Sequence, residues 1–153
     1  MWVTLFWILL FLVFYSYLGY AILLGVLIKL GFRQKDDLGD PDEWPTVALI
    51  VPCFNEGDYI ADKIENSLAL DYPEDKLEYI FISDGSSDNT PEIVKQYEGK
   101  VIAMHEDARR GKAVAMNRAV GATNAEILIF CDANTELNRE AVKNIARHYK
   151  DPK

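Results

Sequence analysis

Two acidic motifs stand where apolar runs of this chain end. Residues 83–90 read Ser-Asp-Gly-Ser-Ser-Asp-Asn-Thr after one run, and residues 130–134 read Phe-Cys-Asp-Ala-Asn after another. In an open α/β sheet, ligands bind in the crevice outside the carboxyl ends of the strands. Asp84 and Asp132 therefore predict a metal-assisted nucleotide site at that edge of a sheet.

The second motif carries two oxygen side chains in the pattern of metal ligands. Asp132 and Asn134 stand at positions i and i+2, so both side chains can converge on one divalent cation. Hard ions such as Mg²⁺ and Mn²⁺ prefer oxygen ligands of this kind. An isolated Asp-x-Asn triplet is also compatible with an ordinary turn, so this prediction depends on its context.

Two further loops offer ligand-binding groups. The sequence Pro-Cys-Phe-Asn-Glu-Gly at 52–57 follows an apolar run and presents backbone groups and the Asn55 amide. The alternative is a plain strand-to-helix turn, with Asn55 or Asp58 capping the helix. Asp84 is placed to accept a hydrogen bond from a base N–H such as that of uracil, and Gly85 permits a tight turn beside it. For Asp88 we favour a capping role.

A basic cluster, Arg-Arg-Gly-Lys at 109–112, precedes a helical pattern in an otherwise acidic chain. A helix amino terminus with a nearby lysine is a ready anion site, so Lys112 is a candidate phosphate ligand. A solvated basic turn is the alternative.

The elements that must position these loops alternate between strand and helix. Such alternation predicts βαβ units and a parallel sheet, and a strand order of 3-2-1-4 would bring the loops together. We expect the last helix to turn Val142, Ile145, Ala146 and Tyr149 inward. The expected strands are Val47–Val51, Leu77–Ile82, Val101–Met104 and Glu126–Cys131, and the expected helices are Tyr59–Leu70, one beginning near Thr90-Pro91, Gly111–Val120 and the last one.

The amino-terminal segment has a different character. Residues 1–28 contain no charged side chain and are rich in Leu, Phe, Ile, Val, Trp and Tyr, which predicts a transmembrane helix over residues 1–30. Lys29, Arg33 and Lys35 follow it, and basic residues beside a span favour the cytoplasmic side. Residues 31–45 are polar, with glycine and proline breakers, and predict a linker to a cytoplasmic domain.

Charge and cysteine content limit the partners. The formal net charge of −8 argues against a nucleic-acid backbone as partner, because such a partner favours a basic face.

Cys53 and Cys131 are the only cysteines, and a cytoplasmic setting makes a structural disulfide unexpected. We therefore expect both to be reduced packing residues.

Taken together and in order, the motifs resemble those of family 2 glycosyltransferases with the GT-A fold. The resemblance covers roughly residues 46–150, and a membrane span before such a domain is similar to the processive polysaccharide synthases of cellulose, hyaluronan or poly-N-acetylglucosamine. The motifs that carry it are Val51-Pro52-Cys53-Phe54-Asn55-Glu56, Ser83–Thr90, Gly111-Lys112-Ala113-Val114-Ala115-Met116-Asn117 and Phe130-Cys131-Asp132-Ala133-Asn134.

The resemblance implies an α/β domain of the GT-A (Rossmann-like) type that binds a nucleotide-sugar, usually a UDP-sugar, together with Mg²⁺ or Mn²⁺. It implies an inverting transfer of the sugar to a glycan or lipid-linked acceptor. The roles that it implies fall on seven residues: Pro52, Asn55 and Glu56 line the nucleoside pocket, Asp84 holds the base, Lys112 approaches the diphosphate, and Asp132 and Asn134 hold the metal.

This sequence departs from the family's pattern in two ways. Asn134 stands where the metal motif usually has a second aspartate, which bears on metal affinity or metal choice. The family's catalytic base lies well downstream of that motif, and Asp151 is too close to take its place. We therefore assign no catalytic residue and expect residues 46–153 to form the donor-binding half of such an enzyme.

The alternative is a non-catalytic, membrane-tethered nucleotide-binding module acting with a partner chain. A Rossmann dehydrogenase is disfavoured because no Gly-x-Gly-x-x-Gly follows the first strand.

Overall fold

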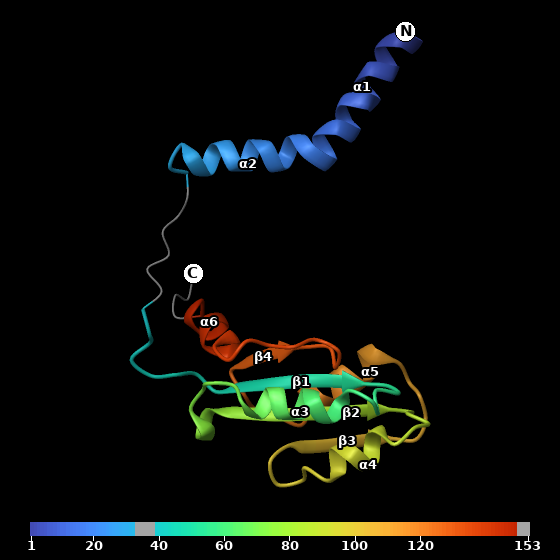
Figure 1. The fold of residues 1–153 in the computed structure, drawn as a ribbon, viewed down its shortest axis with the longest axis vertical. Coiled ribbons are helices and arrows are strands. Elements are labelled where there is room, and N and C mark those ends of the chain that lie inside the picture. Colours follow the sequence, from blue (N-terminus) through green and yellow to red (C-terminus); the bar gives the residue numbers. More distant parts are fainter. Residues whose placement is uncertain (33–38, 150–153) are drawn as a thin grey trace. The chain divides into compact units, whose positions relative to one another are not determined.

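The computed structural model describes residues 1–32 and 39–149, which form an amino-terminal helix and a separate α/β unit (Figure 1). The predicted linker over 31–45 falls partly outside the described residues. So do Arg33 and Lys35, two of the three basic residues behind the predicted orientation in the membrane.

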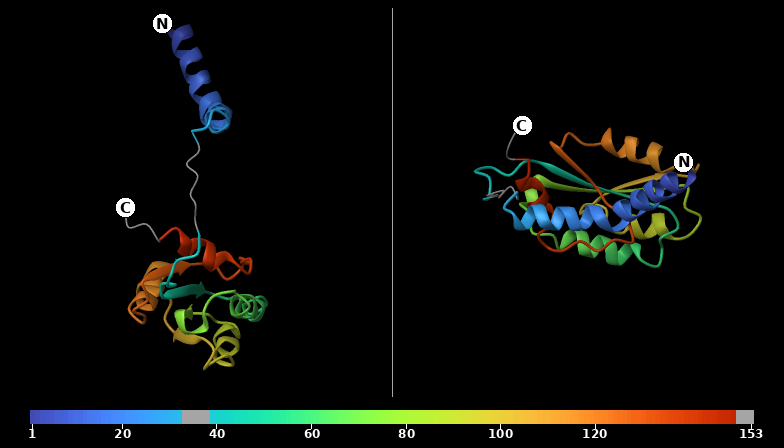
Figure 2. Two further views of the ribbon diagram at one scale, coloured as in Figure 1. Left: turned by 90° about the vertical axis from the view of Figure 1, so that its left-hand side faces the viewer. Right: turned by 90° about the horizontal axis from the view of Figure 1, so that it is seen from above.

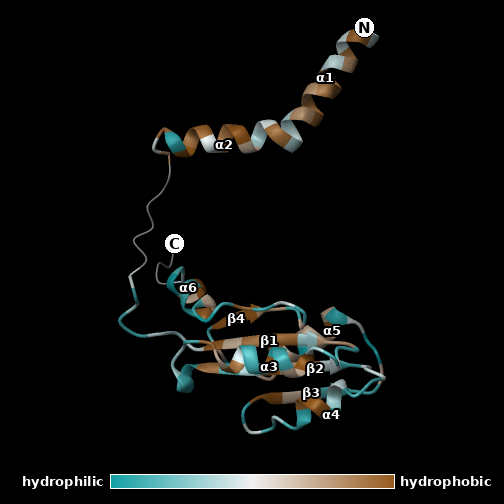
Figure 3. Ribbon diagram, viewed as in Figure 1, coloured by the Kyte–Doolittle hydropathy of each residue, from teal (hydrophilic) through white to brown (hydrophobic). Residues whose placement is uncertain are grey.

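The amino-terminal helix runs from Trp2 to Lys29 and has a mean hydropathy of 2.1, with none of its residues buried. It consists of α1 (Trp2–Phe14), a π-helical segment (Tyr15–Gly19) and α2 (Tyr20–Lys29), and it bends at the π-helical segment (Figure 1). At ~1.5 Å per residue its contour is roughly 40 Å, and a hydrocarbon core is about 30 Å thick. Most of its residues are hydrophobic (Figure 3), and by length and composition the helix can cross a membrane.

The α/β unit is built on a four-stranded parallel sheet with the order β3-β2-β1-β4, which confirms the predicted order. Val47 of β1 lies beside Leu77 of β2 and Ile127 of β4, so the three strands start level with one another. The strands are β1 (Val47–Cys53), β2 (Leu77–Asp84), β3 (Ile102–Glu106) and β4 (Ile127–Phe130). All four coincide with predicted strands, and no strand end is shifted by more than two residues.

Helices cover both faces of the sheet (Figure 2). One face packs against α3 (Ile60–Leu68), α4 (Thr90–Lys95) and α6 (Ala141–Arg147), and the other against α5 (Lys112–Val120). Because β1 is central and buried on both faces, alternate residues enter different clusters: Leu49 faces α3, and Ile50 faces α5. A continuous apolar run is what such a doubly covered parallel strand requires.

Two helices differ from their predicted packing. In α6, Val142 and Ala146 are buried as expected, but Ile145 is 37% exposed, and Tyr149, beyond the end of the helix, is 64% exposed, so the predicted inner stripe is too wide. In α3, Ile60 and Ile64 are buried. The same helix also buries Lys63 and Ser67, two polar residues that an apolar stripe cannot indicate.

Candidate functional site

The loop after β1 is fastened to the loop after β2 through Asn55. Asn55 adopts a left-handed backbone conformation (φ 54°), which asparagine tolerates better than most residues. Its side-chain Oδ1 accepts a hydrogen bond of 2.8 Å from the Ser87 N–H, and its own N–H donates to Ser86 Oγ. Asn55 therefore joins two loops, and the capping role considered for it is not observed.

A second set of hydrogen bonds joins the same two loops through Asp88. Asp88 Oδ1 accepts from the hydroxyl and the N–H of Thr90, and Oδ2 accepts from the Gly57 N–H at 2.9 Å. The Thr90 hydroxyl in turn accepts from the Glu56 N–H. Desolvation alone would raise the pKa of Asp88, but the bonds from Thr90 and Gly57 outweigh it and lower that pKa. The N-cap residue of α4 is Asn89, so Asp88 does not cap that helix as predicted and instead accepts from its first residue, Thr90.

Asp84 ends β2 and is 6% exposed. Its carboxylate accepts hydrogen bonds from the Arg110 N–H (3.1 and 3.2 Å to the two oxygens) and from the Gly111 N–H (2.7 Å). These donors belong to the loop that starts α5, so Asp84 fixes the basic loop 109–112 against the sheet. Gly85 makes the approach possible: a Cβ there would lie 2.6 Å from the Arg109 nitrogen.

The loop after β4 presents its polar side chains to solvent. Asp132 and Asn134 are exposed and flank Ala133, which is buried. Asp132 Oδ1 accepts a hydrogen bond of 2.5 Å from Lys112 Nζ, and both of these side chains are 60% exposed. The metal and phosphate candidates of the sequence thus form an ion pair with each other.

These loops surround one cavity of about 360 Å³ at the carboxyl ends of β1 and β2. It collects six of the seven predicted site residues, whereas Asn55 is exposed and is not among the lining residues. The lining residues are Pro52, Cys53, Phe54, Glu56, Asp84, Arg109, Lys112, Ala115, Asp132, Ala133 and Asn134.

Phe54 and Arg109 line the cavity, and the sequence analysis assigns neither of them a role of its own. The Arg109 guanidinium carbon lies 3.8 Å from the centre of the Phe54 ring, in a cation–π contact. Both residues fall inside motifs noted above, but their contact joins positions far apart in the chain. An aromatic ring in the loop after the first strand is the signal that would have indicated a stacking surface.

Cys53 also lines the cavity, and its thiol is a poor nucleophile. Burial first, and then the charges of Glu56 and Asp88, raise the pKa of its thiol to about 12. The thiol therefore stays protonated at neutral pH. Cys53 and Cys131 are both free and buried, as expected for reduced packing residues.

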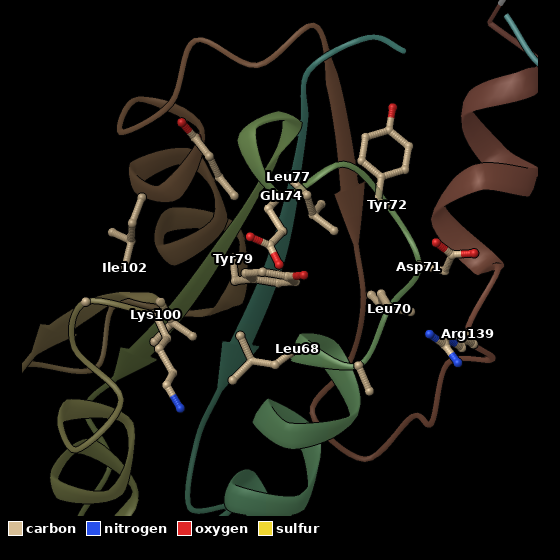
Figure 4. Close-up of a pocket in the computed structure, with 14 residues that line it drawn as sticks. Leu68, Leu70, Asp71, Tyr72, Glu74, Leu77, Tyr79, Lys100, Ile102 and Arg139 are labelled. Atoms are coloured by element: carbon tan, nitrogen blue, oxygen red, sulfur yellow. The ribbon is translucent and has the colours of Figure 1, made fainter.

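A larger cavity, of about 910 Å³, lies at the other end of the sheet, where β2 and β3 begin (Figure 4). Leu68, Tyr79 and Ile102 are among its apolar lining residues, and Asp71 and Arg139 lie together at one side of it. The hydrogen bond from Lys143 is the main cause that lowers the pKa of Asp71. In an open α/β sheet the carboxyl edge is the ligand edge, so we assign the functional site to the smaller cavity.

The residues at the carboxyl edge suit a shared metal ion rather than an all-protein cage. Within residues 1–32 and 39–149, no cluster of three or more His, Cys, Asp or Glu side chains is arranged to hold a metal. Asp132 and Asn134 supply one carboxylate and one amide oxygen. Mg²⁺ is commonly held by one or two carboxylates together with substrate phosphates, and this donor set fits such an ion.

Solved structures with the same fold are known. The mannosyltransferase PcManGT from Pyrobaculum calidifontis, in complex with GDP-Man and Mn²⁺, superposes with a TM-score of 0.76 at 31% identity, covering 90% of this chain and 42% of that one. TarS 1-349 of S. aureus, in complex with UDP-GlcNAc, gives a TM-score of 0.61 at 26% identity, covering 66% and 30%. The expected GT-A fold is confirmed.

Curated relatives agree. The poly-beta-1,6-N-acetyl-D-glucosamine synthase of Staphylococcus aureus (strain MSSA476) is 33% identical over 129 residues, which are 82% of this chain and 31% of that protein. The chain therefore spans about a third of the length of this relative. The family model described as glycosyl transferase family 2 matches residues 48–153. On these grounds the chain belongs to glycosyl transferase family 2.

Proposed function

We propose that this chain is the membrane-anchored, nucleotide-sugar-binding part of an inverting glycosyltransferase. The donor is a UDP-sugar, and the acceptor is a glycan or a lipid-linked saccharide. The observation that carries the proposal is the cavity at the carboxyl ends of β1 and β2, where four loops bring together six residues named from the sequence. Its volume of about 360 Å³ lies in the range of roughly 300–1,000 Å³ found for small-molecule sites.

In this proposal the loop after β1 forms the nucleoside pocket. Pro52 and Glu56 line it, and Asn55 holds it in place through Ser87. Asp84 holds the base. Two ionised oxygens offer about four acceptor sites, and the bonds from Arg110 and Gly111 use three of them, so one remains for a base N–H.

Lys112 and the loop after β4 receive the diphosphate. Lys112 starts α5, so its ammonium adds to the positive end of that helix at the mouth of the cavity. Asp132 and Asn134 would hold a divalent ion, Mg²⁺ or Mn²⁺, which supplies charge stabilisation to the departing nucleotide when bound. The ion pair between Lys112 and Asp132 is then exchanged for contacts to phosphate and metal, which an exposed pair permits at little cost.

The membrane part of the proposal rests on the amino-terminal helix. The helix Trp2–Lys29 anchors the protein, and the α/β unit faces the cytoplasm, where nucleotide-sugars are available as donors. Lys29, at the end of α2, is the described residue that supports this orientation.

Isothermal titration of the chain in detergent micelles with UDP tests the site. We expect binding in the presence of Mn²⁺ and its loss in EDTA. Asp132→Ala should remove the metal-dependent part of the affinity. The matched control is Asp75→Ala, which should bind as the wild type does. Asp75 is an exposed carboxylate in the turn Glu74–Lys76 that precedes β2. If Asp132→Ala binds UDP and Mn²⁺ like the control, the metal assignment is wrong. GDP titrated in parallel shows whether the site prefers uracil.

A further inference from the structure

A buried lysine lies directly behind the loop that carries Asp132 and Asn134. Lys63, on α3, is 4% exposed, and its ammonium donates to the Thr135 carbonyl oxygen at 2.5 Å and to Cys131 Sγ at 3.1 Å. These two partners stand on either side of the Asp-Ala-Asn triplet. A single side chain thus holds both ends of the candidate metal loop.

A second residue on the same helix face holds the continuation of that loop. Asn66 Nδ2 donates to the Leu137 carbonyl oxygen at 2.9 Å, and Asn66 Oδ1 accepts from the Leu137 N–H at 3.0 Å. Lys63 and Asn66 are three residues apart, so they lie on neighbouring turns of α3. The loop has two bonds of its own to the Asp132 carbonyl oxygen, from the Thr135 N–H at 3.2 Å and from Cys131 Sγ at 3.5 Å.

Burying the Lys63 ammonium costs free energy that a purely structural role for this side chain would not require. Among the described residues, no carboxylate lies within 4 Å of its ammonium as an ion-pair partner, and burying an unpaired charge is unfavourable. An apolar side chain of similar length would fill the same space without that penalty. What an apolar residue cannot supply is the fixed position of the backbone between residues 131 and 135.

We propose that Lys63 is a positioning residue, which sets the conformation of the loop 131–135 so that Asp132 and Asn134 present their oxygens to one divalent ion. This inference rests on the proposed function. Lys63 acts through the loop, because its two hydrogen bonds go to Cys131 Sγ and to the Thr135 carbonyl oxygen. Groups that orient metal ligands from behind typically change metal affinity 10–100-fold when they are removed.

The test compares Lys63→Met with Lys95→Met. Lys95 is an exposed lysine on α4, so its substitution is the matched control. The apparent Kd for Mn²⁺ is measured at a fixed concentration of UDP from the electron paramagnetic resonance signal of free Mn²⁺. We expect Lys63→Met to raise this Kd about 10–100-fold and Lys95→Met to leave it unchanged. Uridine, which has no phosphate to share a metal, should bind equally to both variants by saturation-transfer NMR.

The outcomes separate the two proposals. A wild-type chain that binds no Mn²⁺ in the presence of UDP overturns the proposed function and this inference with it. If the wild type binds Mn²⁺ and the Lys63→Met variant binds it with unchanged affinity, this inference alone is overturned. It is also overturned if Lys63→Met loses uridine binding and Mn²⁺ binding to the same extent.

If Lys63→Met does not fold, Lys63→Gln decides, since it keeps a hydrogen-bond donor but is too short to reach both Cys131 and Thr135. A rise of about tenfold or more in the Mn²⁺ Kd then supports the inference, and no change overturns it.

Discussion

The two acidic loops at the carboxyl edge are held in different ways. Asp84 is 6% exposed, and its carboxylate is engaged by two backbone N–H groups of another loop. Asp132 is 60% exposed, and its carboxylate meets one lysine ammonium at 2.5 Å. Asp84 is therefore part of the fold as well as of the candidate site, whereas Asp132 is a surface group whose loop is held from behind.

The different environments of Asp84 and Asp132 suit them to bind different parts of one ligand. Bonds to backbone groups leave Asp84 no alternative position, so the part of the cavity beside it is preformed. An exposed ion pair is weak and can exchange partners, so the part beside Asp132 is adjustable. A nucleoside suits the first environment, and a metal–diphosphate group, which arrives and leaves with its own charge, suits the second.

The largest effect is expected where the Asp84 loop meets the basic loop. Gly85 has φ +70°, and a Cβ would lie 2.6–2.7 Å from the backbone of Arg109. Gly85→Ala should lower the free energy of unfolding by about 3 kcal/mol, because the left-handed backbone and the clash add together. Urea unfolding in micelles measures this.

The matched control for that change is Gly99→Ala. Gly99 also has a left-handed backbone (φ +93°), but a Cβ there meets nothing within 4 Å. Its loss should be limited to roughly 1–2 kcal/mol. Equal losses at Gly85 and Gly99 would show that the close approach of Arg109 has no energetic importance.

The next effect compares the two aspartates directly. Asp84→Asn leaves one acceptor oxygen, and its NH₂ group then stands at the other position, facing the part-buried Arg110 N–H that Asp84 contacts with both oxygens. We expect the free energy of unfolding to fall by about 2 kcal/mol. Asp132→Asn should change it by less than about 0.5 kcal/mol, since the lost ion pair is exposed. A similar cost for both would remove the distinction between the loops.

A smaller effect is expected from pH. The folded-state pKa of Asp88 is lowered from its ordinary value of 3.8, so its ionised form is favoured in the folded protein. The resulting stability is present above pH 3.8 and is lost as the pH falls through the lower, folded-state pKa. Asp88→Asn should flatten that acid limb of the stability profile. An unchanged limb would mean that Asp88 does not join the two loops as described.

The smallest effect on stability is expected at Lys112. Lys112→Met removes the ion pair with Asp132, and the free energy of unfolding should change by less than about 0.5 kcal/mol. The affinity for UDP with Mn²⁺ should nevertheless fall, because a positive charge at the diphosphate is lost. A stability loss as large as that of Asp84→Asn would place Lys112 in the fold, contrary to this comparison.

Features that arise from local pattern could be predicted from the sequence. Apolar runs located all four strands, and the parallel order placed the ends of β1, β2 and β4 together, so Asp84 and Asp132 could be assigned to one edge. The features that could not be predicted depend on partners distant in the chain. Lys63 is buried because it reaches Cys131, which is 68 positions away, and Asn55 reaches Ser87, 32 positions away. Neither residue type indicates such a partner by itself.

The carboxyl-edge cavity, and not the larger one, is the site that we assign to a nucleoside diphosphate. Hydrogen-exchange mass spectrometry of the chain with and without UDP and Mn²⁺ tests this assignment most directly. We expect slower exchange in residues 52–57, 84–90, 109–113 and 131–135, which surround the smaller cavity. Slower exchange confined to residues 68–79 and 99–102, which line the larger cavity, would contradict the assignment, and so would no change anywhere.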